Sequence, residues 1–229
     1  MKTYLFAGAS SAIAKETATL LQANGHKVIG ISTKEKDFAY NEFYQIASYD
    51  FGSFPVLETE IDGLVYFPGT INLKPFHRLK QEEFTTDYTI NTLGAVAFSQ
   101  AYLPNIKKVT QASVVFISTV AVGVGMPFHS SIAMAKGAIE GLTKALAAEY
   151  APSIRVNCIA PSLVNTPLAE KFVSSPEKIE SMQKRNPMQK VGDAIDIANA
   201  VSFLLSDKSG WISGQIMAVD GGMSTLKNG

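Results

Sequence analysis

The chain has 229 residues, of which 46% are hydrophobic and 17% are charged, so its composition is that of a globular rather than a disordered protein. Its 20 Lys and Arg residues balance 20 Asp and Glu residues, which gives no electrostatic case for nucleic acid or an anionic membrane as a partner. The single cysteine, Cys158, rules out an internal disulfide and suits a reducing compartment. The apolar start of the chain is too short for a secretory signal and no stretch could span a bilayer, so we expect a cytoplasmic protein.

Short apolar segments alternate with segments of helical periodicity along the chain. In chain order we expect strand 3–10, helix 12–25, strand 26–32, strand 62–69, helix 82–106, strand 112–119, helix 132–150, strand 154–161, helix 193–206 and strand 214–222. This alternation predicts an α/β fold in one domain over residues 1–229, a doubly wound parallel sheet with helices on both faces. Such a sheet binds its ligand beyond the carboxyl ends of the strands. The stretch 33–43 is too short for a full crossover helix, so we expect a trimmed connection there.

The first strand runs into the sequence "AGASSAIA" before the first helix, which is the context of a dinucleotide-binding turn. Gly8 allows the tight turn, and the hydroxyls of Ser10 and Ser11 could hold a pyrophosphate at the helix N-terminus. Two later glycines of the usual pattern are alanines here, and the methyl group of Ala12 points to where the pyrophosphate approaches. An ordinary strand–turn–helix remains the alternative.

The end of the second strand discriminates between the two nicotinamide dinucleotides. An NAD site places a carboxylate there for the ribose 2′-hydroxyl. This chain has Ser32, Thr33 and Lys34 instead, and two hydroxyls with a cation suit a 2′-phosphate. We therefore expect NADP(H) rather than NAD(H), with a solvated loop carrying an incidental lysine as the alternative.

Two long stretches carry a family resemblance: "AMAKGAIEGLTKALAAEYAPSIRVNCIAPSLVNTPL" and "VSFLLSDKSGWISGQIMAVDGGMS". With the phosphate turn, they make the chain similar to the short-chain dehydrogenase/reductase family over essentially its whole length. The resemblance implies a Rossmann-type fold and hydride transfer to or from a small carbonyl or alcohol substrate. It also implies a homo-oligomer, a tetramer or a dimer, built through the two long helices and the C-terminal strand.

The resemblance assigns roles to individual residues. Lys136 matches the lysine that holds the nicotinamide ribose, Asn91 matches the asparagine of the proton relay, and Thr119 matches the substrate-orienting serine. Together with the turn and the second strand, the predicted cofactor-binding set is Gly8, Ser10, Ser11, Ile13, Ser32, Thr33, Lys34, Asp50, Phe51, Pro68, Gly69, Asn91, Lys136, Pro161, Val164 and Thr166.

The departure from the family is Ile132, which stands four residues before Lys136 where the family has its catalytic tyrosine. In one interpretation the proton donor is another group: Thr119, Ser131, His129 or a bound water. In a second, the protein resembles enoyl reductases, whose tyrosine lies seven residues before the lysine, the position of His129. In a third, it binds NADP(H) as a sensor or partner without catalysis. We favour the first, an NADP(H)-dependent oxidoreductase with an atypical active site.

Two further segments bear on the site. Residues 163–190 match the family's substrate loop, and we expect their central part, 168–187, to form a mobile lid. The sequence "GMPFHSS" predicts a loop that carries His129, with Ser130 or Ser131 as the N-cap of the following helix.

Overall fold

The central element of the computed structural model, which describes residues 1–227, is a seven-stranded parallel sheet. In spatial order its strands are β3 (Glu42–Gln45), β2 (Lys27–Ser32), β1 (Thr3–Ala7), β4 (Gly63–Tyr66), β5 (Ala112–Ile117), β6 (Ile154–Pro161) and β9 (Ile216–Val219). The strand order reverses between β1 and β4, where doubly wound sheets bind their ligands. The prediction of a doubly wound parallel sheet is confirmed.

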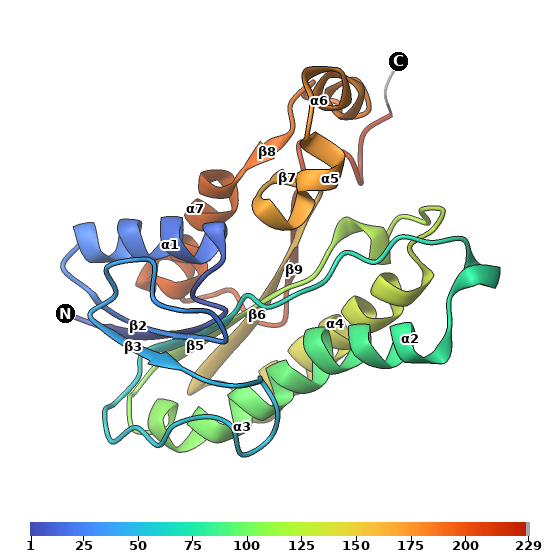
Figure 1. Ribbon diagram of the computed structural model, residues 1–229. Helices are drawn as coiled ribbons and strands as arrows, with labels where there is room; N and C mark the ends of the chain where they lie inside the picture. The colour runs from blue at the N-terminus through green and yellow to red at the C-terminus, as the bar shows by residue number, and fades with distance from the viewer. Residues whose placement is uncertain (228–229) are drawn as a thin grey trace.

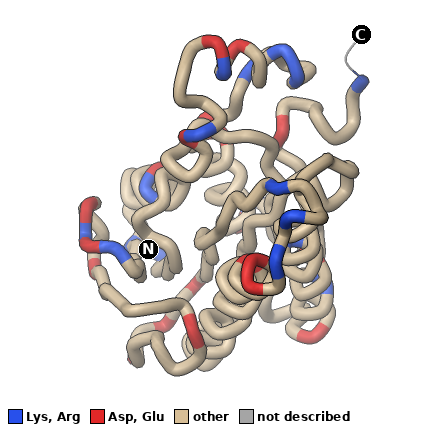
Figure 2. Tube along the Cα trace, turned by 45° about the vertical axis from the view of Figure 1, so that its right-hand side comes forward, with Lys and Arg blue, Asp and Glu red and all other residues tan. Residues whose placement is uncertain are grey.

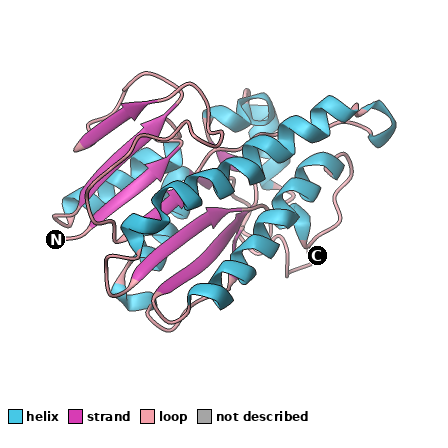
Figure 3. Cartoon of the chain, turned by 90° about the horizontal axis from the view of Figure 1, so that it is seen from below, coloured by secondary structure: helices cyan, strands magenta, loops and turns pink. Residues whose placement is uncertain are grey.

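Helices cover both faces of the sheet, as predicted (Figure 1). One face carries α1 (Ala12–Ala23) and α7 (Ala194–Leu205), and the other carries α2 (Gln81–Tyr88), α3 (Gly94–Ile106) and α4 (Ser130–Tyr150). Seen from below, helices lie in front of the sheet and run roughly along its strands (Figure 3). A separate apolar core fills each interface, because the strands present buried side chains on both faces.

The single long helix expected over 82–106 is interrupted where the site lies. A π-helical segment, Thr89–Leu93, joins α2 to α3. The Tyr66 hydroxyl donates a 2.7 Å hydrogen bond to the Ile90 carbonyl, and a Cβ on Gly94 would lie 2.1 Å from that hydroxyl oxygen. The tyrosine of β4 thus occupies the space beside this wider turn, and Asn91 lies within it. Such π segments are frequent at functional sites.

Two connections lack the usual crossover helix. Residues 33–41 hold no helix, which confirms the trimmed connection, and residues 46–61 between β3 and β4 hold none either. Tyr40 takes up the space of the first missing helix: its buried ring leaves no room for a side chain at Gly30, and its hydroxyl donates a 2.7 Å bond to the Ala9 carbonyl. It therefore supports the phosphate turn from below.

The predicted lid is anchored at both of its ends. Strands β7 (Val164–Asn165) and β8 (Gly192–Asp193) pair with each other at its base. Near its C-terminal end, the Asn186 amide donates a 2.6 Å bond to the Asp220 carbonyl, which follows β9. Two short helices lie between these anchors, α5 (Glu170–Val173) and α6 (Pro176–Gln183). The remaining short elements are 3-10 turns at Phe76–Arg78, Val120–Val122, Pro167–Ala169 and Asp207–Ser209.

In the view of Figure 2, basic and acidic residues are scattered among each other and neither sign dominates the face. Over residues 1–227, no helix is both long and apolar enough to cross a membrane.

Candidate functional site

Lys136 lies on α4 and reaches the carboxyl end of β5. Its ammonium nitrogen donates a 2.7 Å hydrogen bond to the Ile117 carbonyl oxygen, and its side chain is 6% exposed. Burial lowers the pKa of Lys136 to about 8. An ammonium has three N–H donors, and within residues 1–227 Ile117 supplies the one hydrogen-bond acceptor found for them. The site thus holds a buried cation with donors left for a ligand.

Asn91 meets Lys136 at the end of β4. A Cβ on Gly69 would lie 3.2 Å from the Asn91 amide oxygen and 3.4 Å from the Lys136 nitrogen, so both groups face one point. The Asn91 amide nitrogen donates to the Thr70 hydroxyl at 2.8 Å and to the Asp87 carbonyl at 2.7 Å. The structure therefore brings together three residues that are 22 to 67 positions apart in the chain.

Thr119 follows β5 and caps the 3-10 turn Val120–Val122. Its hydroxyl oxygen accepts a 3.3 Å bond from the Ala121 amide, which leaves the hydroxyl proton for another partner. The neighbouring Ser118 hydroxyl donates a 2.7 Å bond to Glu140 of α4, which ties the end of β5 to the helix that carries Lys136.

Ile132 lies on the first turns of α4 and is 5% exposed. Its side chain has no polar atom, so the position one turn before Lys136 offers no proton. Ser131, beside it, is fully buried and donates a 2.5 Å bond to the Asp87 carboxylate. The Ser131 hydroxyl proton is thus already donated to Asp87 and is not available to a substrate.

His129 is the N-cap residue of α4, and the helix begins at Ser130. The expectation that Ser130 or Ser131 would cap this helix is therefore wrong: the helix begins one or two residues earlier than expected, and Ser131 bonds to Asp87 instead. The His129 Nδ1 atom lies 2.8 Å from the Pro127 carbonyl, which orients the ring.

The phosphate turn and the end of β4 are in direct contact. Gly8 has a φ of +73°, and a Cβ there would lie 2.8 Å from the Pro68 ring, so both backbone and space require glycine. Ser11 is the N-cap of α1 and accepts a 3.4 Å bond from the Ala14 amide. Ile13 packs partly buried against the core between α1 and α7.

The end of β2 meets this turn. The Ser32 hydroxyl donates to the Ser10 hydroxyl at 3.1 Å and accepts from the Lys34 amide at 3.0 Å. The side chains of Thr33 and Lys34 are exposed, and the Thr33 amide lies 3.4 Å from the Tyr49 hydroxyl. Four predicted residues thus share one corner, together with Tyr49, which the sequence analysis missed.

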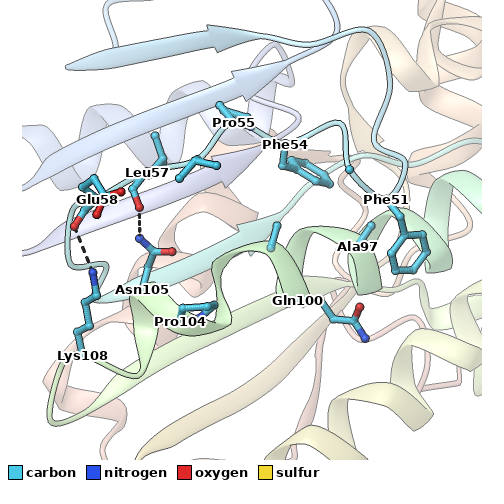
Figure 4. A pocket seen from close by; sticks show the side chains of 13 residues that line it. Phe51, Phe54, Pro55, Leu57, Glu58, Ala97, Gln100, Pro104, Asn105 and Lys108 are labelled. Atoms are coloured by element: carbon cyan, nitrogen blue, oxygen red, sulfur yellow. Dashed lines mark hydrogen bonds between the residues drawn. The ribbon is translucent and has the colours of Figure 1, made fainter.

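Asp50 and Phe51 lie on the loop after β3, and both are exposed. Phe51 lines a groove of about 580 Å³ between residues 51–58 and α3, with Ala97 and Gln100 on the opposite wall (Figure 4). Lys136 does not line this groove, so the cofactor-binding role that the family resemblance implies for Asp50 and Phe51 stays a prediction.

The segment after β6 lies beside the C-terminal strand. Pro161 ends β6 and is opposite Val219 of β9, and Val164 starts the paired base of the lid. The Thr166 hydroxyl donates a 3.4 Å bond to the Val164 carbonyl. These residues flank the same carboxyl edge of the sheet as Lys136.

Thr70 and Asp87 were also missed by the sequence analysis, although both contact Asn91 or its partners. Asp87 is 2% exposed, and its carboxylate accepts from the Thr70 hydroxyl at 2.6 Å. A signal was present, because Asp87 lies four residues before Asn91 and therefore on the same helical face.

Comparisons with known proteins agree with this geometry. A family model described as Enoyl-(Acyl carrier protein) reductase matches residues 56–224. Oxidoreductase UcpA of Salmonella typhimurium is 34% identical over 220 residues, 93% of this chain and 81% of that protein. A chloroplastic tropinone reductase homolog of Arabidopsis thaliana is 35% identical over 74% of this chain, which spans about half (53%) of that protein's length.

Solved structures share the fold. ElxO with NADP bound has a TM-score of 0.87 at 26% identity, covering 99% of this chain and 100% of that one, and a Tyr-to-Phe variant of ElxO is solved with NADPH bound. The family match spans most of this chain and the UcpA match spans nearly all of it. The chain therefore belongs to the short-chain dehydrogenase/reductase family.

Proposed function

We propose that this protein is an NADP(H)-dependent oxidoreductase that acts on a small carbonyl or alcohol substrate with an atypical active site. The observation that carries the proposal is the buried Lys136 ammonium, which faces the same point as Asn91 at the carboxyl edge of the sheet. A buried cation with unused donors is costly unless a ligand completes its hydrogen bonds.

The residues present fit a nicotinamide dinucleotide. Lys136 would hold the nicotinamide ribose through its free N–H donors, and Ser10 with the amides of the phosphate turn would hold the pyrophosphate. Lys34, whose backbone amide donates to the Ser32 hydroxyl, brings an exposed cationic side chain to this corner, and the residues Ser32, Thr33 and Lys34 include no carboxylate, which favours a 2′-phosphate. ElxO, of similar fold, binds NADP, and its Tyr-to-Phe variant binds NADPH. Loss of a tyrosine hydroxyl is thus compatible with cofactor binding in this fold.

The chemistry requires groups that orient the substrate oxygen and exchange a proton with it. The bound nicotinamide would supply or accept the hydride. Thr119 would donate its free hydroxyl proton as a hydrogen bond to the substrate oxygen and so orient it. A positioned acid contributes about 10²–10⁴-fold in rate, and Ile132 removes it from the usual place. We propose that His129, Thr119 or a bound water replaces it; at His129, the Pro127 carbonyl engages Nδ1 and leaves Nε2 to exchange a proton.

A second candidate function is NADP(H) binding without turnover. The observation that favours it is the burial of Ile132, which makes the wall one turn from Lys136 apolar. In that case the protein would report the state of the dinucleotide pool or bind a partner.

Calorimetric titration with NADPH and NADH tests the proposal first. We expect tighter binding of NADPH, and weaker binding after Lys136→Ala; equal affinity for both cofactors would overturn the NADP(H) assignment. A panel of ketones, aldehydes and alcohols then separates the two functions. Turnover of any of them supports the oxidoreductase, and tight NADPH binding with no turnover across the panel supports the second candidate.

We also propose a homo-oligomer, dimeric or tetrameric. Strand β9 is at the edge of the sheet and leaves one side of its backbone open to pairing. Light scattering after gel filtration tests this, and a monomer at all concentrations would contradict it.

A further inference from the structure

Asp87 is a buried carboxylate that the proposed chemistry does not use. It lies on α2, is 2% exposed, and touches two other parts of the chain. One carboxylate oxygen accepts from Thr70, in the loop after β4, and the other accepts from Ser131, in the first turn of α4. Burial of an acidic side chain without such donors would be strongly unfavourable, so the cluster has to be satisfied as a unit.

The direction of each hydrogen bond in this cluster is fixed. The Asn91 amide nitrogen can only donate, so the Thr70 hydroxyl accepts from it and donates its one proton to Asp87. The Thr70 oxygen thus takes a 2.8 Å bond from the Asn91 amide nitrogen. The second N–H of that amide goes to the Asp87 carbonyl at 2.7 Å.

The Asn91 amide oxygen is left as the free end of this chain of bonds. It accepts a long 3.3 Å bond from the Thr70 amide and faces the point that it shares with Lys136. We propose that Asp87 is a positioning residue, whose carboxylate acts through the Thr70 hydroxyl to hold the Asn91 amide oxygen toward Lys136. The further step, in which Asn91 and Lys136 together bind the cofactor, rests on the proposed function. The orientation of the Asn91 amide oxygen does not depend on it.

The orientation has an electrical consequence that can be measured without cofactor. A carbonyl dipole with its oxygen toward an ammonium stabilises the charged form. The Cys158 thiol on β6 also acts on Lys136, but burial raises the pKa of Cys158 to about 12, so it stays neutral near pH 8. Glu140, one turn after Lys136 on α4, is held by Ser118.

The experiment is an NMR titration of Lys136 in the cofactor-free protein, with ¹³C at the lysine side chains and the signal assigned by its loss in Lys136→Arg. In Asp87→Leu and Thr70→Val the oxygen loses its support, and we expect the pKa of Lys136 to fall from about 8 toward neutrality. Asp87→Asn keeps an acceptor for Thr70, and Thr70→Ser keeps the hydroxyl, so both should retain the wild-type value.

Thr92→Val is the matched control. The Thr92 hydroxyl donates a buried 2.8 Å bond to the Ala135 carbonyl, which joins the π segment to α4 next to Asn91, and this bond does not involve the Asn91 amide. It should lower the melting temperature without moving the Lys136 titration. In an Asn91→Ala background, Asp87→Leu should have no further effect on Lys136, because the group through which it acts is gone.

Three results would overturn the positioning role. The first is an unchanged pKa of Lys136 in both Asp87→Leu and Thr70→Val. The second is a fall of this pKa in Asp87→Asn as large as in Asp87→Leu, which would assign the effect to the charge of Asp87. The third is an undiminished effect of Asp87→Leu in the Asn91→Ala background. The cofactor is a separate readout: NADPH affinity should fall about fivefold to tenfold in Thr70→Val and stay unchanged in Thr92→Val. Failure of the wild-type protein to bind NADPH would reject the proposed function and leave the Lys136 result standing.

Discussion

The Lys136 ammonium donates a 2.7 Å hydrogen bond to the backbone carbonyl of Ile117, and it forms no ion pair with a carboxylate of residues 1–227. Its pKa is lowered from 10.5 to about 8 because the charged form is desolvated. The unfolded chain therefore binds one more proton than the folded protein between about pH 8 and pH 10.5, and stability rises with pH in that window.

This difference gives a stability prediction for Lys136→Met. The variant has no titrating group at this position. Between pH 8 and pH 10.5 the free energy of unfolding of the wild type should therefore rise by about 3 kcal/mol relative to that of the variant. Urea unfolding of both proteins across this range measures the difference, in which the other titrating groups cancel. Parallel curves would mean that Lys136 is not desolvated.

Ile132→Tyr should create or raise reduction of activated ketones. The new phenol would lie one turn from Lys136, whose cation favours the phenolate and brings the phenol's pKa closer to neutrality. Ile132→Phe is the control, because it has the same ring without the hydroxyl. Steady-state rates with NADPH compare the two, and equal rates in a folded protein would show that the pocket has diverged beyond the loss of the acid.

Lys34→Ala should weaken NADPH binding more than NADH binding, by about tenfold, since a phosphate loses its cation while a hydroxyl loses little. Lys36→Ala is the matched control on the same exposed loop, two residues further from the Ser32 corner. Titration calorimetry with both cofactors gives the four affinities. Equal losses of NADPH affinity in the two variants would indicate a general effect of positive charge on this loop rather than a contact between Lys34 and the phosphate.

His129→Gln should lower kcat by about tenfold or more with little change in NADPH affinity, if the imidazole donates the proton as proposed. It should also remove the inflection that an imidazole donor gives to the pH–rate profile. His77→Gln, in an exposed turn, should change neither quantity. An unchanged kcat in His129→Gln would leave Thr119 and solvent as the source of the proton.

Two helical glycines should respond to alanine in opposite directions. A Cβ on Gly94 would collide with the Tyr66 hydroxyl, so Gly94→Ala should destabilise the protein and disturb the π segment that holds Asn91. Gly141, on α4, has nothing within 4 Å of its virtual Cβ, and Gly141→Ala should stabilise by up to about 1 kcal/mol. Melting temperatures and NADPH affinity of both variants check this, and a stabilised Gly94→Ala would contradict the packing argument.

Much of the fold follows from local patterns in the sequence. The apolar strands and periodic helices lie close to where they are expected, because the pattern of apolar residues sets which faces are buried. The edge strand β3, whose side chains are at most partly buried, was not predicted. The parallel arrangement brings Gly69, Asn91 and Lys136 to one edge of the sheet. The family resemblance supplied the roles of these residues, and the structure supplies their proximity.

The features that were not predicted depend on contacts between distant segments. The π segment needs the hydroxyl of Tyr66, which is 24 residues from its partner Ile90. The burial of Asp87 needs Thr70 and Ser131 from two other elements. The N-cap of α4 differs from the predicted one because the Ser131 hydroxyl, which could cap a helix, donates its hydrogen bond to the Asp87 carboxylate instead.

The anchored lid has a consequence for how ligands exchange. Because β7 and β8 pair at its base and Asn186 is bonded to the segment after β9, we expect any motion of the lid to be confined to the two short helices between these anchors. Ligand entry then requires no loosening of the central sheet. Amide hydrogen exchange should show this as a sharp boundary, with fast exchange over α5 and α6 and slow exchange in β6, a few residues earlier in the chain.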